Sequence, residues 1–330
     1  MVPDASQSEI DSEIDIERIG RAGVITLNRP AALNALTLPM IRAIQRGLDH
    51  HLADPAVQVI VIRSSSPRAF CAGGDMRRIR ELSLAGAFDE IAAFFQDEYA
   101  LNLAINRCAK PFVALLDGIA MGGGLGLSIH GRHRIVTEHA SLAMPETAIG
   151  FIPDVGASHF LSRLEPAIGM WLALTGARID ATAALAVGLV TQMTRREHLA
   201  ALLAALADAS AGPIDAVLQR FAGEADTAAA LAALRQRATG FDAPRLDAVL
   251  ATWQAASGAD ALAAFSPAAV AQTFALLNAA QGKSLAECLA LEFDGSMHAA
   301  RHADFIEGAR AVLVDKDRKP RWQAPWPSTQ

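Results

Sequence analysis

Residues 112–129 read FVALLDGIAMGGGLGLSI, and this stretch decides the fold. Its first five residues form an apolar run without alternation, which predicts a strand buried on both faces. The glycines at 118 and 122–124 permit tight turns and a close approach of the backbone to a ligand. Leu125 to His130 has the composition to begin a helix. The order of strand, glycine turn and helix predicts an α/β fold.

The residues near the N-terminus predict a hairpin followed by a helix. Ile14–Ile19 and Gly23–Leu27 flank the turn signal Gly-Arg-Ala-Gly, which is typical of two paired strands. Apolar residues then recur with a helical period between 41 and 52, after a plausible Thr37 cap and Pro39 in the first turn.

Two further elements are expected before the glycine-rich stretch. The β-branched run Val57–Ile62 lacks alternation, which predicts a strand buried in a parallel sheet between helices. Residues 88–106 carry one apolar stripe at helical spacing, and Glu98 lies beside that stripe.

The second half of the chain is alanine-rich and is expected to be mainly helical. Residues 198–208 and 226–238 have helical composition with few aromatic side chains. We therefore expect three parts: a flexible N-terminus at 1–11, a core with the active site at 12–195, and a helical region packed on it at 196–330.

Composition excludes several classes of function. The 330 residues are 52% hydrophobic and 19% charged, with a net charge of −6, so no basic field would attract nucleic acid or an anionic membrane. The three cysteines match neither a zinc site nor a disulfide framework, and we expect no metal. We expect no membrane span, because no apolar stretch is long enough for one, and we expect no targeting peptide.

Two glycine loops are candidates for binding an oxyanion. Met121–Gly124 follows a predicted strand, and 70–75 (FCAGGD) follows another short apolar stretch. Paired backbone N–H donors suit acyl transfer or enolate chemistry, because both develop negative charge on a carbonyl oxygen. Either loop could instead be a structural turn, and neither matches a Walker A or G-x-G-x-x-G motif.

Two acids interrupt an apolar region and are candidates for acid–base chemistry. Glu146 follows Pro145, and Asp154 comes eight residues later in Pro-Asp-Val-Gly. Burial among apolar neighbours would raise their pKa values toward the working range of a general acid or base. Alternatively, Glu146 caps the backbone after Pro145, and Asp154 begins a helix at 155–163.

Nucleophilic side chains are weaker candidates for catalysis than these acids. No serine stands in a G-x-S-x-G elbow, and no histidine pair has the spacing and acid partner of a metal or triad site. Cys71 could act as a nucleophile beside its loop, but a packed thiol is the preferred interpretation.

Four motifs in order resemble the crotonase, or enoyl-CoA hydratase/isomerase, superfamily. They are Arg29–Leu36, Ala69–Asp75, Gly118–Gly124 and Pro145–Glu146. The resemblance implies a spiral of repeated ββα units, with the thioester carbonyl held by the N–H groups of Gly74 and Gly123. It also implies a CoA substrate along residues 32–34 and 68–73, and no cofactor besides that CoA. The implied substrate-binding residues are Ala32, Asn34, Arg68, Ala69, Ala72, Gly73, Gly122 and Glu98.

Departures from the hydratase pattern narrow the expected activity. Gly126 stands where hydratases of this superfamily carry their first glutamate, so only Glu146 remains of the usual pair. Residues 121–131, 144–150 and 304–317 resemble the branch that hydrolyses 3-hydroxyisobutyryl-CoA in valine breakdown. This resemblance implies that Glu146 activates water or attacks the thioester, while Asp154 binds the substrate hydroxyl.

Several alternatives remain open at this point. The chain could be an enoyl-CoA hydratase or isomerase that uses Glu146 alone, or an acyl-CoA-binding protein without activity. It could be a monomer, or a trimer or hexamer as is common in the superfamily. Its alanine-rich, arginine-rich composition suggests a bacterial cytosolic enzyme.

Overall fold

The computed structural model describes residues 13–323, without the side chains of residues 259 and 260. The chain forms two compact units. Unit 1 combines residues 13–74, 100–142 and 179–228, and unit 2 combines 75–99, 143–178 and the residues from 229 onward. The segment at 1–11, expected to be flexible, lies outside the described residues. The expected boundary at residue 195 stays a prediction.

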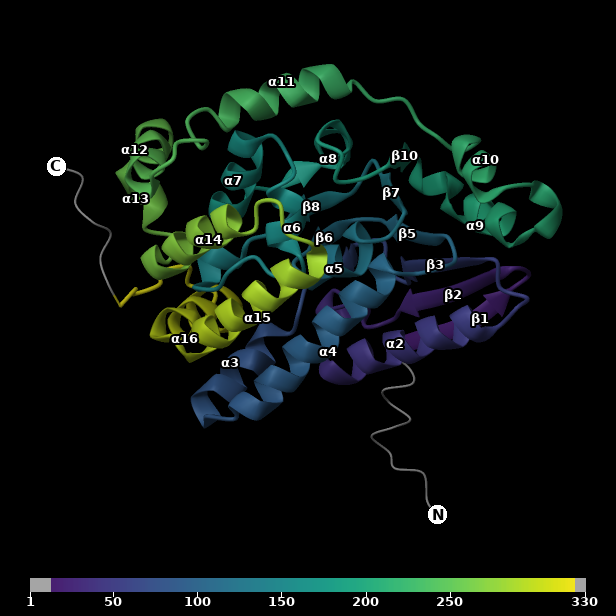
Figure 1. The fold of residues 1–330 in the computed structure, drawn as a ribbon, viewed down its shortest axis with the longest axis horizontal. Helices are drawn as coiled ribbons and strands as arrows, with labels where there is room; N and C mark the ends of the chain where they lie inside the picture. Colours follow the sequence, from purple (N-terminus) through teal and green to yellow (C-terminus); the bar gives the residue numbers. More distant parts are fainter. Residues whose placement is uncertain (1–12, 324–330) are drawn as a thin grey trace, which may run out of the picture. The chain divides into compact units, whose positions relative to one another are not determined.

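A six-stranded sheet forms the centre of unit 1. Its strands, in spatial order, are β1 (Ile14–Ile19), β2 (Ala22–Leu27), β3 (Val59–Ser64), β5 (Phe112–Leu116), β7 (His133–Thr137) and β10 (Gln192–Thr194). The first two strands form the predicted antiparallel hairpin, and all later neighbours are parallel. Figure 1 shows β2, β3 and β5 beside one another.

A smaller sheet takes one strand from each successive turn of the chain. It consists of β4 (Ala69–Cys71), β6 (Ile119–Met121), β8 (Ser141–Ala143) and β9 (Ile179–Asp180). Strand pairs β3–β4, β5–β6 and β7–β8 each send one strand to either sheet and are followed by a helix or helical turn. This order confirms the predicted α/β spiral of ββα units.

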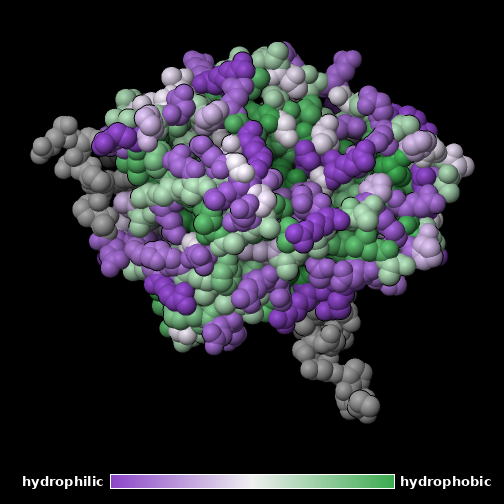
Figure 2. All heavy atoms as spheres, in the orientation of Figure 1, coloured by the Kyte–Doolittle hydropathy of each residue, from purple (hydrophilic) through white to green (hydrophobic). Residues whose placement is uncertain are grey.

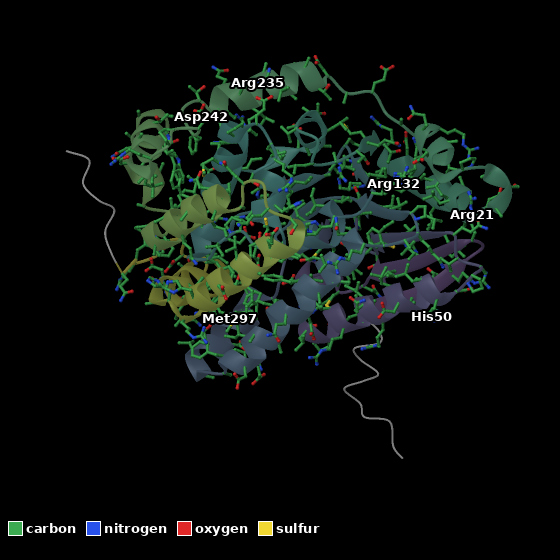
Figure 3. All side chains as sticks on the ribbon, in the orientation of Figure 1. Arg21, His50, Arg132, Arg235, Asp242 and Met297 are labelled. Atoms are coloured by element: carbon green, nitrogen blue, oxygen red, sulfur yellow. The ribbon has the colours of Figure 1, made fainter. Side chains whose placement is uncertain are left out.

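The central strands of unit 1 are buried on both faces, as the unalternating apolar runs predict. One face carries Val59, Val61, Val113 and Leu115, and it packs on α9 (Leu199–Ala207) and α10 (Ile214–Gln219). Arg21, labelled in Figure 3, joins the hairpin turn to this helical layer, because its guanidinium donates to the carbonyl oxygens of Leu206 and Gly212.

Local sequence signals predict where the helices and strands of unit 1 begin, and the structure corrects two of these predictions. α2 (Leu38–Ala53) begins after Thr37, whose side chain accepts the Met40 N–H as predicted for an N-cap. β3 begins at Val59 and not at Val57, since Val57 still forms a turn with Asp54. α5 (Gly123–Ile129) begins two residues earlier than expected because Gly122 adopts a positive φ and serves as its N-cap.

Unit 2 is mainly helical, and the described residues from 196 onward, which belong to both units, are also mainly helical, as predicted. Its main helices are α3 (Met76–Ala85), the first part of α4 (Phe88–Asn106), α6 (Ala157–Leu161), α7 (Pro166–Thr175), most of α11 (Thr227–Arg237), α12 (Leu246–Ser257), α14 (Pro267–Ala279), α15 (Leu285–Arg301) and α16 (Ala303–Ala309). A short 3₁₀ turn, η2 (Glu146–Ile149), precedes α6. In Figure 1, α14, α15 and α16 lie close together.

An aromatic cluster fills the centre of unit 2. Phe151 packs on Phe95 with ring centroids 5.7 Å apart and on Phe305 at 5.2 Å. Phe95 also contacts the ring of Tyr99, at 5.9 Å. These rings bring α4, the segment after η2 and α16 into one core, so parts of the sequence about 200 residues apart share it.

The surface in Figure 2 mixes hydrophilic residues, drawn in purple, with smaller hydrophobic areas in green. Among the described residues, the exposed large hydrophobic side chains are Ile16, Leu84 and Val314, a scatter that is normal for a protein surface. In the part of the chain that the structure describes, no helix is long and apolar enough to cross a membrane.

Candidate active site

The two glycine loops that could bind an oxyanion lie side by side in unit 1. β4 and β6 pair in parallel, so the loops that follow these strands leave the smaller sheet at the same edge. A Cβ atom added to Gly73 would lie 3.6 Å from the backbone nitrogen of Gly123. Gly74 forms a parallel bridge to Leu36, and the Gly73 carbonyl accepts the Leu36 N–H at 2.8 Å. Both loops are therefore held in place by neighbouring backbone.

Glycine is required at both turns by the backbone conformation. Gly73 has φ +106° and Gly122 has φ +47°, in a region that residues with a Cβ rarely adopt. Gly123 is the first residue of α5, where a helical N–H has no partner within the helix. Whether the N–H groups of Gly74 and Gly123 bind an oxyanion stays a prediction.

Gly124→Ala is expected to destabilise this part of the molecule. A Cβ atom at this position would lie 2.3 Å from the Cys71 carbonyl oxygen, which belongs to a strand and cannot rotate away. Alanine favours a helix by about 1 kcal/mol over glycine, but overpacking typically costs about 1–3 kcal/mol. Urea denaturation should show a net loss. Gly223→Ala is the matched control, since its nearest atom lies at an ordinary 3.6 Å; equal stability of the two variants would contradict the overlap.

The segments expected to contact CoA are held together by a buried amide. Asn34 is fully buried, and its Nδ2 donates to the Ser64 hydroxyl at 2.7 Å and to the Phe70 carbonyl at 2.9 Å. Its Oδ1 accepts the Arg29 N–H at 2.8 Å. The Asn34 side chain therefore joins residues 32–34 to 69–70 and is not available to a ligand. Whether the other residues of these segments bind CoA stays a prediction.

Other residues of these segments differ in their access to solvent. Arg68 is exposed, and Ala32 and Ala72 are partly exposed, whereas Ala69 and Gly122 are buried. The Cys71 thiol is also buried and donates to the Asn34 carbonyl at 3.1 Å. This placement supports the packed thiol over the nucleophile.

Unit 2 gathers the three acids singled out in the sequence. Glu98 comes from α4, Glu146 begins η2, and Asp154 lies in the loop before α6. Each is at least nine-tenths buried, and the electrostatic interactions of Glu146 and Glu98 with Asp154 place all three near one another. Glu98 Oε1 and Glu146 Oε2 have no hydrogen-bond partner in the described part of the chain.

Burial and mutual repulsion raise the pKa values of these acids. Burial, followed by repulsion from Asp154, raises the pKa of Glu98 and of Glu146 well above the usual carboxyl range. Burial also raises the pKa of Asp154, to about 7, although the Tyr99 hydroxyl favours the ionised form by donating to Oδ2 at 2.7 Å. A carboxyl group with a pKa of about 7, such as that of Asp154, can give and take protons near neutral pH.

The helix-cap interpretations of Glu146 and Asp154 are wrong. Pro145 is the N-cap of η2, and Gly156 is the N-cap of α6, which starts at Ala157 and not at residue 155. The helix starts later because Val155 and Gly156 both adopt positive φ angles, of 52° and 84°. For a β-branched residue this conformation is an outlier, and such strain is concentrated at functional sites.

Sequence reasoning missed the groups that surround Asp154. The Tyr99 hydroxyl contacts Ser296 of α15 at 2.8 Å as well as Asp154. Glu292, also on α15, accepts the backbone N–H groups of Gly156 and Ser158 at 2.6 and 2.8 Å. Only the placement of Glu292 as a buried acid in an apolar helix segment could have indicated it, since its partners lie more than 130 positions away.

Comparisons with known proteins identify the family to which the chain belongs. The sequence profile of the enoyl-CoA hydratase/isomerase family matches residues 22–328. The chain belongs to this family. A carnitinyl-CoA dehydratase of Mycobacterium thermoresistibile superposes on this family member with a TM-score of 0.85 at 32% identity, covering 94% of this chain and 91% of the other. An enoyl-CoA hydratase of Rhodobacter sphaeroides 2.4.1 gives 0.78 at 38% identity, covering 95% and 93%.

Curated relatives of this enoyl-CoA hydratase/isomerase family member carry a more specific name. A human protein named 3-hydroxyisobutyryl-CoA hydrolase, mitochondrial, is 40% identical and covers 97% of this chain and 86% of its own length. A Danio rerio protein of the same name is 39% identical, covering 98% and 87%. These likenesses confirm the resemblance seen in the motifs.

The expectation of a bacterial cytosolic enzyme is contradicted by these relatives. Their names place them in mitochondria, and the sources are vertebrates. The expectation rested on alanine-rich and arginine-rich composition, which is not a targeting signal and carries no information on compartment.

Proposed function

We propose that this member of the enoyl-CoA hydratase/isomerase family hydrolyses a 3-hydroxyacyl-CoA thioester, with 3-hydroxyisobutyryl-CoA as the leading substrate. The observation that carries the proposal is the buried group of Glu98, Glu146 and Asp154, whose pKa values are all raised. The names of the relatives over nearly the whole chain support the same activity.

In the proposed reaction, the N–H groups of Gly74 and Gly123 donate to the thioester carbonyl oxygen. Negative charge develops on this oxygen when the carbonyl carbon becomes tetrahedral, and each preorganised donor stabilises it by about 3–4 kcal/mol. Both donors are backbone groups on rigid turns, so they need no reorganisation when the charge appears. Of the proposed CoA-binding residues, Arg68 offers an exposed positive charge to the phosphates.

Glu146 acts on the carbonyl carbon by one of two routes. As a general base, it takes a proton from water, which attacks the carbonyl and expels CoA thiolate. As a nucleophile, its Oε atom attacks first, CoA thiolate leaves, and water then hydrolyses the mixed anhydride. A single turnover in ¹⁸O-labelled water tests for the nucleophilic route by mass spectrometry of the Glu146 peptide. Label in Glu146 requires the anhydride, with water attacking the glutamyl carbonyl, whereas label only in the hydroxy acid fits either the general base or attack of water on the acyl carbonyl of the anhydride.

Asp154 is assigned to the substrate hydroxyl. Tyr99 occupies Oδ2, which leaves Oδ1 as the acceptor for a 3-hydroxyl group. Glu98, another buried acid with an unpartnered oxygen, lines the same pocket in this proposal. A substrate without the hydroxyl would leave a buried polar group unpaired, which strongly disfavours its transition state.

The rival activity is hydration of an enoyl-CoA by Glu146 alone. Gly126 argues against it, because the buried helix α5 offers no second glutamate at that position.

We expect the enzyme to release thiol from 3-hydroxyisobutyryl-CoA much faster than from isobutyryl-CoA, and not to hydrate crotonyl-CoA. A thiol-reactive dye measures the first two rates, and loss of the enoyl absorbance measures the third. Crotonyl-CoA hydration faster than any thiol release would overturn the proposal, and tight thioester binding without turnover would favour a binding protein.

The partners proposed for this chain are limited to its acyl-CoA substrate, with no nucleic acid, membrane, metal or added cofactor. The assembly states predicted for it are a monomer, a trimer or a hexamer, and size-exclusion chromatography with light scattering measures which one forms.

A further inference from the structure

Helix α15 provides a buried carboxyl group that the proposed reaction does not use. Glu292 is 0% exposed, and both of its oxygens accept hydrogen bonds from the segment that follows Asp154. Oε2 accepts the Gly156 N–H, while Oε1 accepts both the N–H and the hydroxyl of Ser158. All three donors therefore come from a stretch of three residues.

These bonds replace a cap that the local sequence cannot supply. α6 begins after Gly156, which has no side chain to accept the free N–H groups at the start of the helix. Glu292, which lies on α15, accepts hydrogen bonds from two N–H groups at this helix start, much as an N-cap side chain would. It thereby stabilises the two consecutive left-handed residues, Val155 and Gly156, that separate Asp154 from the helix.

The same helix contacts Asp154 by a second route. Ser296 lies one turn after Glu292, and its hydroxyl contacts the Tyr99 hydroxyl. Tyr99 has one proton, which it donates to Asp154, so Ser296 must donate to Tyr99. The order of donors is Ser296, Tyr99 and Asp154, which holds the Asp154 carboxyl in one orientation.

Close packing keeps α15 in register with this loop. A Cβ atom on Gly295 would lie 2.5 Å from Ile152 Cδ1, so a larger residue there would force the Ile152 side chain to move. Glu292 and Gly295 thus meet this segment directly, and Ser296 reaches Asp154 through Tyr99.

We propose that Glu292 is a positioning residue for the active site, which fixes the strained Asp154 loop so that Asp154 can receive the substrate hydroxyl. This inference rests on the proposed function, because Glu292 is proposed to affect catalysis only by positioning Asp154. Glu292 itself touches neither substrate nor reacting atoms.

The first experiment is a double-mutant cycle between Glu292→Gln and Asp154→Asn, measured as thiol release from 3-hydroxyisobutyryl-CoA. Glutamine keeps the shape of Glu292 but turns an NH₂ group toward a backbone N–H donor. We expect kcat to fall about 10- to 100-fold, with KM little changed, because the hydrogen bonds of a buried carboxyl group are disturbed. In the Asp154→Asn background, the same change should have little further effect, because the group it positions is already lost.

Glu287→Gln is the matched control, since Glu287 lies on the same helix in an exposed capping box with Ser284. It weakens α15 without contacting the Asp154 loop and should leave kcat near that of the wild type. If Glu292→Gln lowers kcat by the same factor in both backgrounds, the role of Glu292 is structural and the proposal is wrong. Wild-type kcat in Glu292→Gln would overturn it equally. If Asp154→Asn alone leaves turnover unchanged, the proposed function fails first and this inference fails with it.

Ser296→Ala provides a second measurement if Glu292→Gln does not fold. The titratable groups that face Asp154 are Glu98 and Tyr99 from α4, Glu146 from η2 and Glu292 from α15. Loss of the Ser296 donor frees Tyr99 to turn away, which weakens the hydrogen bond that favours ionised Asp154. The acid limb of the kcat/KM profile should move upward by as much as about one pH unit. An unchanged limb would show that α15 does not act on Asp154.

Discussion

Glu146→Gln is expected to lower the rate of thiol release from 3-hydroxyisobutyryl-CoA by about 10³-fold or more, because positioned acid–base groups contribute about 10²–10⁴-fold and a nucleophile contributes further. Glutamine has nearly the same shape but can neither accept a proton at neutral pH nor attack a thioester. KM should change little, since substrate binding does not depend on the charge that develops in the transition state. Steady-state assays with a thiol-reactive dye measure both constants.

The raised pKa of Glu146 makes a loss of folding an improbable cause of that result. Burial and the neighbouring acids disfavour its charged form, so the neutral glutamine should keep or raise the stability of the fold. Glu165→Gln serves as a control in the same unit, because Glu165 is exposed and pairs with Arg235 at the surface. Its turnover should match the wild type. Equal turnover of Glu146→Gln and Glu165→Gln would remove Glu146 from the mechanism.

Asp154→Asn is expected to change activity and stability in opposite directions. Turnover of the hydroxylated substrate should fall by about 10²-fold or more, because the charged acceptor for its hydroxyl is lost. Stability at pH 8 should rise, since burial raises the pKa of Asp154 from 3.8 to about 7 and its ionised form is disfavoured in the fold. Three pKa units correspond to about 4 kcal/mol, reduced by about 1–3 kcal/mol for an amide group without partners.

The sign of this pH dependence follows from proton binding. In the folded state Asp154 holds its proton up to about pH 7, whereas the unfolded chain releases it near 3.8. Its contribution to stability is therefore fully present below about pH 4 and is lost as the pH rises through 7. Urea denaturation at pH 5 and pH 8 should show a smaller decrease for Asp154→Asn than for the wild type. Parallel decreases in the two proteins would mean that Asp154 is not a buried acid with a raised pKa.

The same pairing of lower activity with higher stability is a general property of buried catalytic acids. Burial and mutual repulsion raise the pKa values of Glu98, Glu146 and Asp154, and the rest of the fold must offset the free energy that burying these acids requires. The aromatic packing of Phe151 on Phe95 and Phe305 is one source of that stability.

Short-range patterns were sufficient for most elements of this fold. The hairpin of β1 and β2, the Thr37-capped helix α2 and the strand β5 follow from contacts within a few residues, and each was predicted close to its observed position. The glycine loops were also recognisable, because positive φ angles at Gly73 and Gly122 leave glycine as the suitable residue. The motifs built on these loops led to the family.

The predicted ends of strands and helices were wrong where a distant group determines the backbone conformation. β3 begins only where it pairs with its neighbours, two residues after its apolar run starts. α6 begins at Ala157 because Val155 and Gly156 are held in a left-handed conformation from α15. A local window contains neither partner, so composition alone favoured the earlier start.

The sequence by itself determined the spiral fold, the family and the candidate acids, because each depends on residue types at short and ordered spacing. Only the tertiary structure decided how those acids are held. Tyr99 reaches Asp154 across 55 positions of the chain, Glu292 reaches the Asp154 loop across 136, and Ser296 reaches Tyr99 across 197. Side chains so far apart meet only after the helices of unit 2 have packed, and it is this packing that buries the acids and raises their pKa values.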